Sequence, residues 1–517
     1  MLLHFLIYEA SHLLQCTLIL LIVFFMVSGV RKLRMNLPPG PWGIPFFGYL
    51  PFLGPNTYIA MYELSKKFGD IYSIALGQRV MIVLSDPMVI REAFNQSAFT
   101  GRPMTPLYGM FKGFGVLNTR GKMWKDERRF IHQKLIKLGM KKFGSGREQM
   151  EQRIQTEVRH LLDCVHKTGG EAVSMDQFLT ALSTNVITSF LLSTRYDAYD
   201  PIFLKHKEIN GEGFKLFAKL DMVNYIWALK FLPGVVKDMK KLCANHAESM
   251  DFFRNLIQER RKTYIPGDDK DVLDYYLSVE YERETPILNF DEQVAQVLCD
   301  LVSAGSESVK TTASWVLAYL LHHDHVVHKM RCEIDEHVGR DRLPNMADQT
   351  RLIYCQAVIN EVMRIANVVP IAPNHAAEAD FNLHGYFIPK GSSVVALLYA
   401  CHMSPKYWDE PQEFRPERFI NEQGRLTCPQ AFIPFGKGQR NCLGDTIAQS
   451  EIFLLLTALI QNFTLENPIG CPLPSLEGVQ GATLCPQDFK VSMKSRSSKT
   501  VTSDPRPPPA TTILMHG

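Results

Sequence analysis

The stretch Ala431-Phe-Ile-Pro-Phe-Gly-Lys-Gly-Gln-Arg-Asn-Cys442-Leu-Gly-Asp445 predicts a glycine-bearing loop that carries one cysteine into a helix, because an apolar-periodic run from Ile447 to Leu459 follows it. A cysteine just before a helix N-terminus, with Lys437 and Arg440 close by, stands where the helix dipole and positive charge favour thiolate over thiol. The glycines let the backbone pass flat against a large ligand. The stretch therefore predicts a thiolate metal ligand. Taken alone, a cysteine in such a turn also fits a buried structural role.

The composition indicates a large globular body and excludes several functional classes. A chain of 517 residues with 46% hydrophobic content can bury a large core, and its length alone suggests about three domains. Fifty-six basic against fifty-three acidic residues leave a formal charge of +3, which argues against a nucleic-acid partner. The eleven cysteines show no paired spacing, so we expect a reducing compartment and no disulfide framework.

The first thirty residues predict a membrane anchor. From Leu13 to Val30 the run is apolar apart from a few small or polar residues, and it approaches the roughly 20 residues that cross a bilayer. Arg31, Lys32 and Arg34 follow at once, whereas the first fifteen residues contain no lysine or arginine. The positive-inside rule therefore places the amino terminus in the lumen and the rest in the cytosol.

The chain beyond this run divides into three parts. We expect a stiff basic and proline-rich hinge over residues 31–50, since each proline removes an amide donor and restricts the residue before it. A catalytic body over residues 51–495 follows. The polar, proline-rich end over residues 496–517 is expected to be disordered.

Within the body, helical patterns dominate and β-strands are few. Apolar residues on both sides of Gly77 predict a hairpin over residues 71–84, and similar patterns occur over residues 383–397 and 481–491. The aromatic-rich segment from residue 201 to 234 needs a partner surface, and core packing is the default interpretation.

A helix over Gly121-Lys-Met-Trp124-Lys-Asp-Glu-Arg128 places an indole and a guanidinium four residues apart on one face. The two groups together suit an acidic ligand, and bidentate pairing of arginine with a carboxylate is the strong form of this contact. An ordinary exposed helix face is the alternative.

A second, longer helix is predicted from the capping-box pattern Asn289-Phe-Asp-Glu292 to about His322. A glycine inside a helix costs about 1 kcal/mol relative to alanine, so we expect Gly305 to allow the approach of a ligand plane or a local distortion. Glu307 and Ser308 supply an acid and a hydroxyl there, a pair that can relay protons. The alternative is a charged helix face beside a serine.

Glu361 and Arg364 lie three residues apart on a helix that begins near Arg351, and Arg418 adds a second arginine from a later loop. A buried cluster of this kind is costly unless every group is satisfied, so its expected role is to fix the loop that carries Cys442. Such a pair on an exposed helix would carry no information.

The pattern Phe435-Gly-x-Gly-x-Arg440-x-Cys442-x-Gly444 resembles the haem-binding signature of the cytochrome P450 superfamily, the haem-thiolate monooxygenases. Five motifs in the family's order cover residues 38–491, so the resemblance spans nearly the whole chain. It implies a single, mainly α-helical domain with a small β-region, in place of the several domains suggested by length. It also implies haem b, with the sulfur of Cys442 as the axial ligand of the iron.

The resemblance implies that the segment from residue 201 to 234 forms a mobile roof over the substrate channel, and it assigns further residues. Those placed against the haem are Trp124, Arg128, Ala304, Gly305, His375, Phe435, Gly436 and Arg440, and those expected to face the substrate are Val369 and Ile371. Ser308 stands where the family usually has threonine, whose β-branching fixes its side chain. This departure predicts a more loosely oriented hydroxyl.

The implied activity is hydroxylation of a lipophilic substrate with O2 and NADPH at the endoplasmic reticulum membrane. A diflavin NADPH–cytochrome reductase would dock on Lys122, Lys125, Arg129 and Lys437. The chain looks most similar to animal microsomal hydroxylases, which favours a steroid-like substrate such as an ecdysteroid precursor over a broad xenobiotic range. Two other classes stay open: a haem-thiolate isomerase or dehydratase acting on peroxides, and a haem-based sensor.

Overall fold

The computed structural model describes residues 35–77, 79–283 and 288–496, together with seven residues between His12 and Met26. The predicted anchor over residues 1–30 and the start of the hinge therefore lie almost wholly outside the described residues, and so does the predicted tail beyond residue 496. Among the residues described, no helix is both long enough and apolar enough to span a bilayer. Arg496 pairs with Asp335 and donates to the carbonyl of Gln461 at 3.0 Å.

Helices dominate the described chain, as the sequence predicts. The α-helices are α2 (Thr57–Phe68), α3 (Pro87–Asn95), α4 (Gly121–Lys137), α5 (Arg147–Lys167), α6 (Asp176–Leu191), α7 (Pro201–Leu220), α8 (Pro233–Thr263), α9 (Val272–Tyr281), α10 (Phe290–His322), α11 (Asp324–His337), α12 (Ile353–Ala366), α13 (Leu398–Met403) and α14 (Asp445–Asn462).

The strands form small sheets. They are β1 (Ile71–Leu76), β2 (Arg79–Leu84), β3 (Ala172–Val173), β4 (His375–Ala376), β5 (Phe381–Leu383), β6 (Tyr386–Ile388), β7 (Ser393–Ala396), β8 (Phe463–Glu466), β9 (Val479–Gln480), β10 (Leu484–Cys485) and β11 (Val491–Ser495). The largest sheet has the order β1-β2-β7-β4, in which β2 and β7 are parallel and the other neighbours antiparallel. A three-stranded sheet has the order β3-β11-β8, and β5–β6 and β9–β10 are hairpins.

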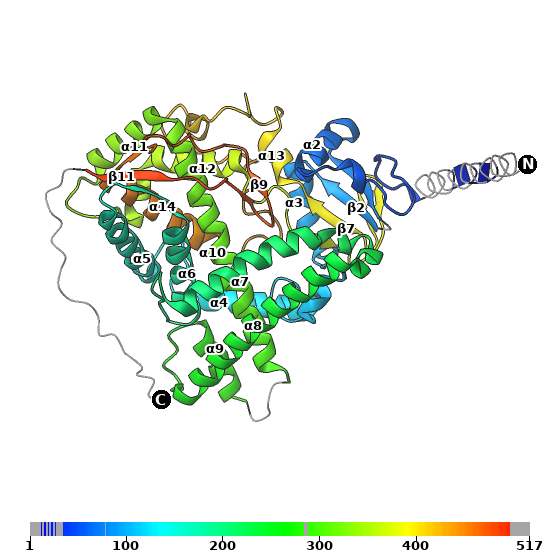
Figure 1. Ribbon diagram of the computed structural model, residues 1–517, viewed down its shortest axis with the longest axis horizontal. Helices are drawn as coiled ribbons and strands as arrows, with labels where there is room; N and C mark the ends of the chain where they lie inside the picture. The colour runs from blue at the N-terminus through cyan, green and yellow to red at the C-terminus, as the bar shows by residue number, and fades with distance from the viewer. Residues whose placement is uncertain are drawn as a thin grey trace, which may run out of the picture.

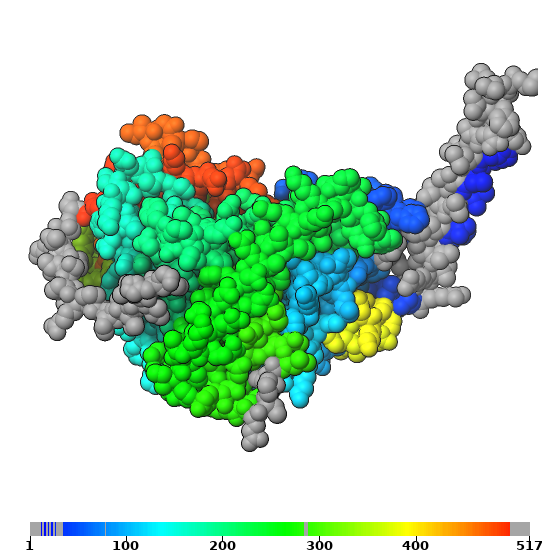
Figure 2. Space-filling view, turned by 60° about the horizontal axis from the view of Figure 1, so that its bottom comes forward, coloured from blue at the N-terminus to red at the C-terminus, as the bar shows by residue number. Residues whose placement is uncertain are grey.

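Two regions lie on either side of the long central helix α10 (Figure 1). The largest sheet and the helices α2 and α3 lie at the end of the molecule nearest the N-terminal segment, whereas α5, α6, α11, α12 and α14 form the helical end. The helices α7 and α8 cross one face and cover both regions, as their continuous green surface in Figure 2 shows.

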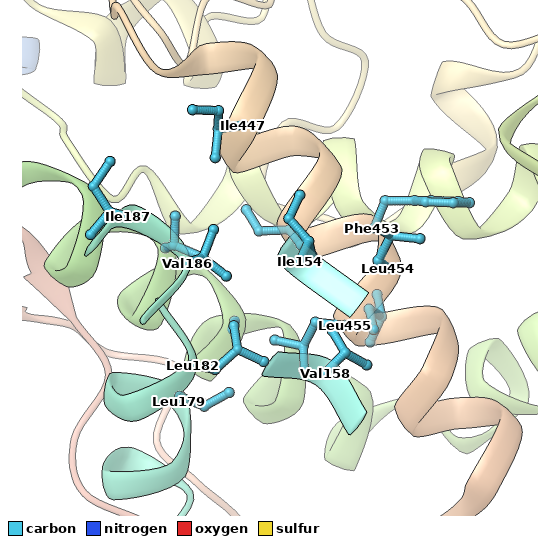
Figure 3. Close-up of a cluster of buried hydrophobic side chains, with 14 of the residues drawn as sticks. Ile154, Val158, Leu179, Leu182, Val186, Ile187, Ile447, Phe453, Leu454 and Leu455 are labelled. Atoms are coloured by element: carbon cyan, nitrogen blue, oxygen red, sulfur yellow. The ribbon is translucent and has the colours of Figure 1, made fainter. Parts of the chain in front are cut away.

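The largest core cluster joins α5, α6 and α14 (Figure 3). Ile154 and Val158 from α5 face Leu182 from α6 and Leu455 from α14, and all four side chains are buried. Burying an aliphatic side chain of this size stabilises the fold by about 1.5–3 kcal/mol. The packing fixes α14, whose N-terminus follows the cysteine loop.

The predicted hairpin over residues 71–84 and the long helix ending at His322 are confirmed. The capping-box prediction at Asn289 is wrong. Asn289 has a left-handed backbone with φ of 56° and makes no side-chain capping bond. Glu292 instead accepts a hydrogen bond from Arg254 of α8 at 2.6 Å, so its carboxylate is used in fixing α8 to α10.

Candidate functional site

The cysteine loop is held in place by backbone hydrogen bonds before α14 begins at Asp445. The amide of Cys442 donates to the carbonyl of Phe435 at 2.9 Å, which closes the loop. A Cβ at Gly438, whose φ is +86°, would collide with the carbonyl of Phe94 in α3, so the loop lies directly against that helix. The side chain of Cys442 is accessible to solvent, although protein atoms surround it closely.

The prediction that the surroundings lower the pKa of Cys442 is wrong for the protein chain alone. Burial raises the pKa of this thiol, while the Gly444 amide and the Arg128 guanidinium act in the opposite direction and only partly offset burial. A bound metal cation deprotonates a coordinating thiol outright. The thiolate form is therefore tied to metal binding.

Two predicted arginines converge on this loop. Arg128 from α4 donates to the carbonyl of Asn441 at 2.7 Å and to its side-chain oxygen at 2.9 Å, so α4 is fixed to the residue before Cys442. Arg440 donates to the carbonyl of Thr100 at 2.6 Å and to that of Thr119. The guanidinium of Arg440 also lies 4.1 Å from the ring centroid of buried Trp124.

Arg102 completes the group and was missed by sequence reasoning. It is buried and donates to the carbonyls of Leu117 at 2.9 Å and Asn374 at 2.8 Å. Its segment, Gly101-Arg102-Pro103, carries no motif spacing that would mark it. Only the fold brings it beside Arg128 and Arg440, each of which it influences electrostatically.

His375 lies in the same region. Its Nδ1 donates to the carbonyl of Phe99 at 2.7 Å, and its ring stacks on Phe94 with 3.8 Å between centroids. Burial, followed by the charge of Arg102, lowers the pKa of His375 to about 3, so the ring is neutral. His375 is therefore a buried, neutral histidine.

The cationic cradle formed by Arg102, Arg128 and Arg440 has an unusual charge balance. Among the residues that the structure describes, none of the three forms an ion pair with a carboxylate. Burial lowers the pKa of Arg440 to about 8, and repulsion from the other two arginines adds to this effect. Buried charges are costly unless paired. A dianionic ligand beside Cys442 would pair them, and the two propionates of haem fit this requirement.

The structure shows a packing reason for Gly305 on the side of the helix that faces α6. α10 is helical throughout this stretch, and a Cβ at Gly305 would lie 2.9 Å from Cγ1 of Ile187 in α6. The glycine therefore allows close packing of α10 on α6, and the expected local distortion is absent. Ala304, one residue earlier in α10, is exposed.

Glu307 and Ser308 point to different partners. The Glu307 carboxylate accepts from Lys310 at 2.9 Å, and the Cys485 thiol approaches it at 3.9 Å. The Ser308 hydroxyl donates to the carbonyl of Ala304 at 2.8 Å, one turn back in the same helix. The structure does not join the acid and the hydroxyl by a hydrogen bond.

A cavity of about 1060 Å³ lies under α7 and α8. Val369 and Ile371, which were expected to face the substrate, line it together with Glu307 and Phe489. The aromatic-rich segment contributes Phe203, Phe214 and Phe217, so it covers the cavity. Ala304, Ser308 and Cys442 are not among its lining residues, whereas Asn374, whose carbonyl accepts from Arg102, lines the cavity.

The predicted charge cluster is fully buried. Glu361 accepts from Arg364 at 2.7 and 2.8 Å and from Arg418 at 3.0 Å. Arg364 also donates to the carbonyls of His402 and Pro411, each at 2.8 Å. Every charged group in the cluster therefore has partners, as the cost of burial requires.

His402, also missed by sequence reasoning, links this cluster to the cysteine loop. Its Nε2 accepts from the amide of Ile433 at 3.1 Å, which requires the proton on Nδ1, and Nδ1 lies 2.7 Å from the side-chain oxygen of Asn367. Burial lowers the pKa of His402 to about 3. Arg364 is thus linked to Ile433, near the start of the loop, through one neutral histidine, His402.

The residues expected to dock a reductase have unequal exposure. Lys122, Lys125 and Arg129 are exposed along α4, whereas Lys437 is half-buried. The three exposed groups lie on the helix that also carries Trp124 and Arg128, so a positive surface covers the arginine side of the site.

Comparisons with known proteins agree with this geometry. A family model described as Cytochrome P450 matches residues 38–493. The chain is 39% identical to cytochrome P450 18a1 of Drosophila melanogaster, over 96% of this chain and 94% of that protein. It is 32% identical to cytochrome P450 2B15 of Rattus norvegicus, with 90% and 94% covered, and 32% identical to cytochrome P450 2L1 of Panulirus argus, with 90% and 96% covered.

Proposed function

Because the chain belongs to the cytochrome P450 family and is thus a haem-thiolate monooxygenase that uses O2 and reductase-derived electrons, we propose that it hydroxylates a steroid-like lipid at the endoplasmic reticulum membrane. The observation that carries the proposal is the cationic cradle beside the Cys442 loop, adjacent to a large cavity. The cavity volume lies just above the roughly 300–1,000 Å³ typical of ligand pockets.

The residues of the site take separate roles in this proposal. The sulfur of Cys442 would hold the iron of the haem, and Arg102, Arg128 and Arg440 would pair with its propionates. When bound, the haem supplies the redox chemistry that activates O2. Glu307 and Ser308 relay protons once the Ser308 hydroxyl turns away from the Ala304 carbonyl, to which it donates in the structure.

An apolar surface supports the membrane proposal. Phe46 is 77% exposed in the N-terminal segment, and Trp227 and Phe231 are 54% and 65% exposed between α7 and α8. These segments meet at the β1–β2 turn, because the Gly77 amide donates to the carbonyl of Phe47 at 3.0 Å and a Cβ at Gly77 would collide with the carbonyl of Tyr225. Lys230 lies 5.1 Å from the Phe231 ring, as expected where a lysine stem covers an apolar surface at a membrane boundary. Lipid-dissolved substrates would enter the cavity from this side.

A diflavin reductase is the proposed electron donor, and α4 the proposed docking helix. Reversing the charges of Lys122 and Lys125 to glutamate should slow reduction by the reductase, most strongly at low salt. Unchanged reduction at both low and high salt would remove α4 from the docking surface.

The substrate proposal is tested by spectral titration of the full-length protein with sterols, ecdysteroid precursors and drug-like lipids, followed by product identification with reductase and NADPH. Turnover of one steroid group at low concentration supports the proposal, and comparable turnover of unrelated drug-like lipids replaces it with a broad-range enzyme. Product formation without NADPH would indicate an isomerase or dehydratase. The Cys442→Ser variant is the control, since it removes the metal ligand.

A further inference from the structure

A short segment connects the long helix to the cationic cradle. Residues 115–119 precede α4 and lie between α10 on one side and the arginines on the other. On the α10 side, the amide of Gly115 donates to the side-chain oxygen of Gln293 at 3.0 Å, and the Gln293 amide group donates back to the Gly115 carbonyl at 3.2 Å. The segment is therefore fastened to α10 through its backbone.

Asp300 provides the second fastening, seven residues further along the same helix face. One carboxylate oxygen accepts from the amides of Val116 at 2.9 Å and Leu117 at 3.0 Å. The other accepts from Gln296 at 2.9 Å. A carboxylate that accepts backbone amide bonds forms the stronger, charge-assisted kind.

The opposite side of the same peptides holds the arginines. The carbonyl of Leu117 accepts from Arg102 at 2.9 Å and from Arg440 at 3.3 Å, and the carbonyl of Thr119 accepts from Arg440. Leu117 is thus bonded to Asp300 through its amide and to two guanidinium groups through its carbonyl. A displacement of this residue moves the acceptors that orient the cradle.

We propose that Asp300 is a positioning residue for the haem: it fixes the segment from Gly115 to Thr119, whose carbonyls hold Arg102 and Arg440 in the orientation that binds the propionates. The inference rests on the proposed role of these arginines. Asp300 acts through the amides of Val116 and Leu117, without touching the cofactor itself.

The surroundings explain why a carboxylate is needed at this position. All three groups that contact Asp300 are donors, so an amide in its place would direct its own N–H group at one of them. Gln296 cannot easily turn round, because its side-chain oxygen is already bonded to His246 of α8 at 2.8 Å. A Cβ at Gly115, where φ is +87°, would collide with the Asp300 carboxylate, so the segment lies as close to this side chain as its backbone allows.

The test measures the rate at which haem leaves the purified holoprotein for excess apomyoglobin. We expect Asp300→Asn to accelerate haem loss by about 10- to 100-fold, the usual effect of removing an outer-shell partner of a metal site. Asp291→Asn is the matched control, because it makes the same chemical change in α10 at a residue that pairs with Arg261, away from the segment. Equal rates in the two variants would overturn the proposal.

A double-mutant cycle with Arg440→Lys separates positioning from general loss of stability. If Asp300 acts through the arginine, the rate increase in Asp300→Asn/Arg440→Lys falls well below the product of the two single increases. A rate increase in the double variant equal to the product of the two single increases would overturn the positioning role. An unchanged rate in Arg440→Lys alone would instead overturn the proposed propionate contact. Should Asp300→Asn fail to fold, Gln293→Leu replaces it, and unchanged haem loss there would equally contradict the inference.

Discussion

Replacing Glu361 with glutamine should destabilise the protein far more than its small chemical change suggests. The side chain is fully buried, and its carboxylate accepts from Arg364, from Arg418 and from the backbone amide of Arg415 at 2.8 Å. Glutamine keeps the shape but removes the charge. Two guanidinium groups would then stay buried, at 0% and 6% exposure, with no carboxylate beside them.

The size of the effect follows from the cost of an unpaired buried charge. Removing one partner of a buried ion pair costs about 3–5 kcal/mol, whereas whole domains are stable by about 5–15 kcal/mol. The variant would therefore lose a large part of its stability. Because Arg364 also holds the carbonyl of His402, which binds the segment before the cysteine loop, haem should be lost during unfolding at a lower temperature than in the wild type.

The assay is thermal unfolding followed by circular dichroism, with haem absorbance recorded in parallel. Glu466→Gln is the matched control, since Glu466 pairs with Lys494 at the surface, where the side chains are 43% and 59% exposed and such pairs contribute about 0–1 kcal/mol. Similar midpoints for the two variants would refute the reasoning that burial makes the Glu361 cluster costly to break.

Three further predictions concern other buried groups. Burial raises the pKa of Glu451 well above its usual range, and one of its oxygens has no hydrogen-bond partner among the described residues; ionisation in the folded state therefore becomes more costly as pH rises above the ordinary glutamate value. Glu451→Gln should stabilise the protein at pH 8 by about 1–3 kcal/mol, seen as a higher unfolding midpoint, and this gain should disappear near pH 4. A gain that grows on acidification would contradict the prediction. Ser308→Ala should increase peroxide released per product and Ser308→Thr should decrease it, and equal coupling in all three proteins would exclude Ser308 from the proton relay. His402→Leu leaves the Ile433 amide without its acceptor and should cost about 1–3 kcal/mol, seen as a smaller haem-loaded fraction than in the exposed-site control His132→Leu.

Much of the architecture could be predicted because it depends on local sequence patterns. The hairpin around Gly77 and the helix that ends at His322 depend on periodicity that a single sequence displays. The Cys442 loop was recognisable because its glycines and arginine occur at fixed spacing. No local pattern, by contrast, joins Glu361 with Arg418, because the two residues lie 57 positions apart in the chain.

The missed residues share a physical cause. Arg102 and His402 act through backbone carbonyls and amides of distant segments, and such contacts leave no trace in residue spacing. The packing role of Gly305 was missed for a similar reason, because the neighbour that requires a glycine there is Ile187 on another helix. The pKa of Cys442 depends on burial, which outweighs the dipole and charge that the sequence displays.

The contact between Gly305 and Ile187 makes the volumes of two positions complementary. Ile187 is not among the residues that line the cavity, yet its methyl groups limit how near α10 can come to α6. A substitution at position 187 would therefore shift the helix that carries Ala304 and Ser308. It would also move Glu307, which lines the cavity. Substitutions at position 187 could therefore be used to change the cavity without replacing any residue that lines it.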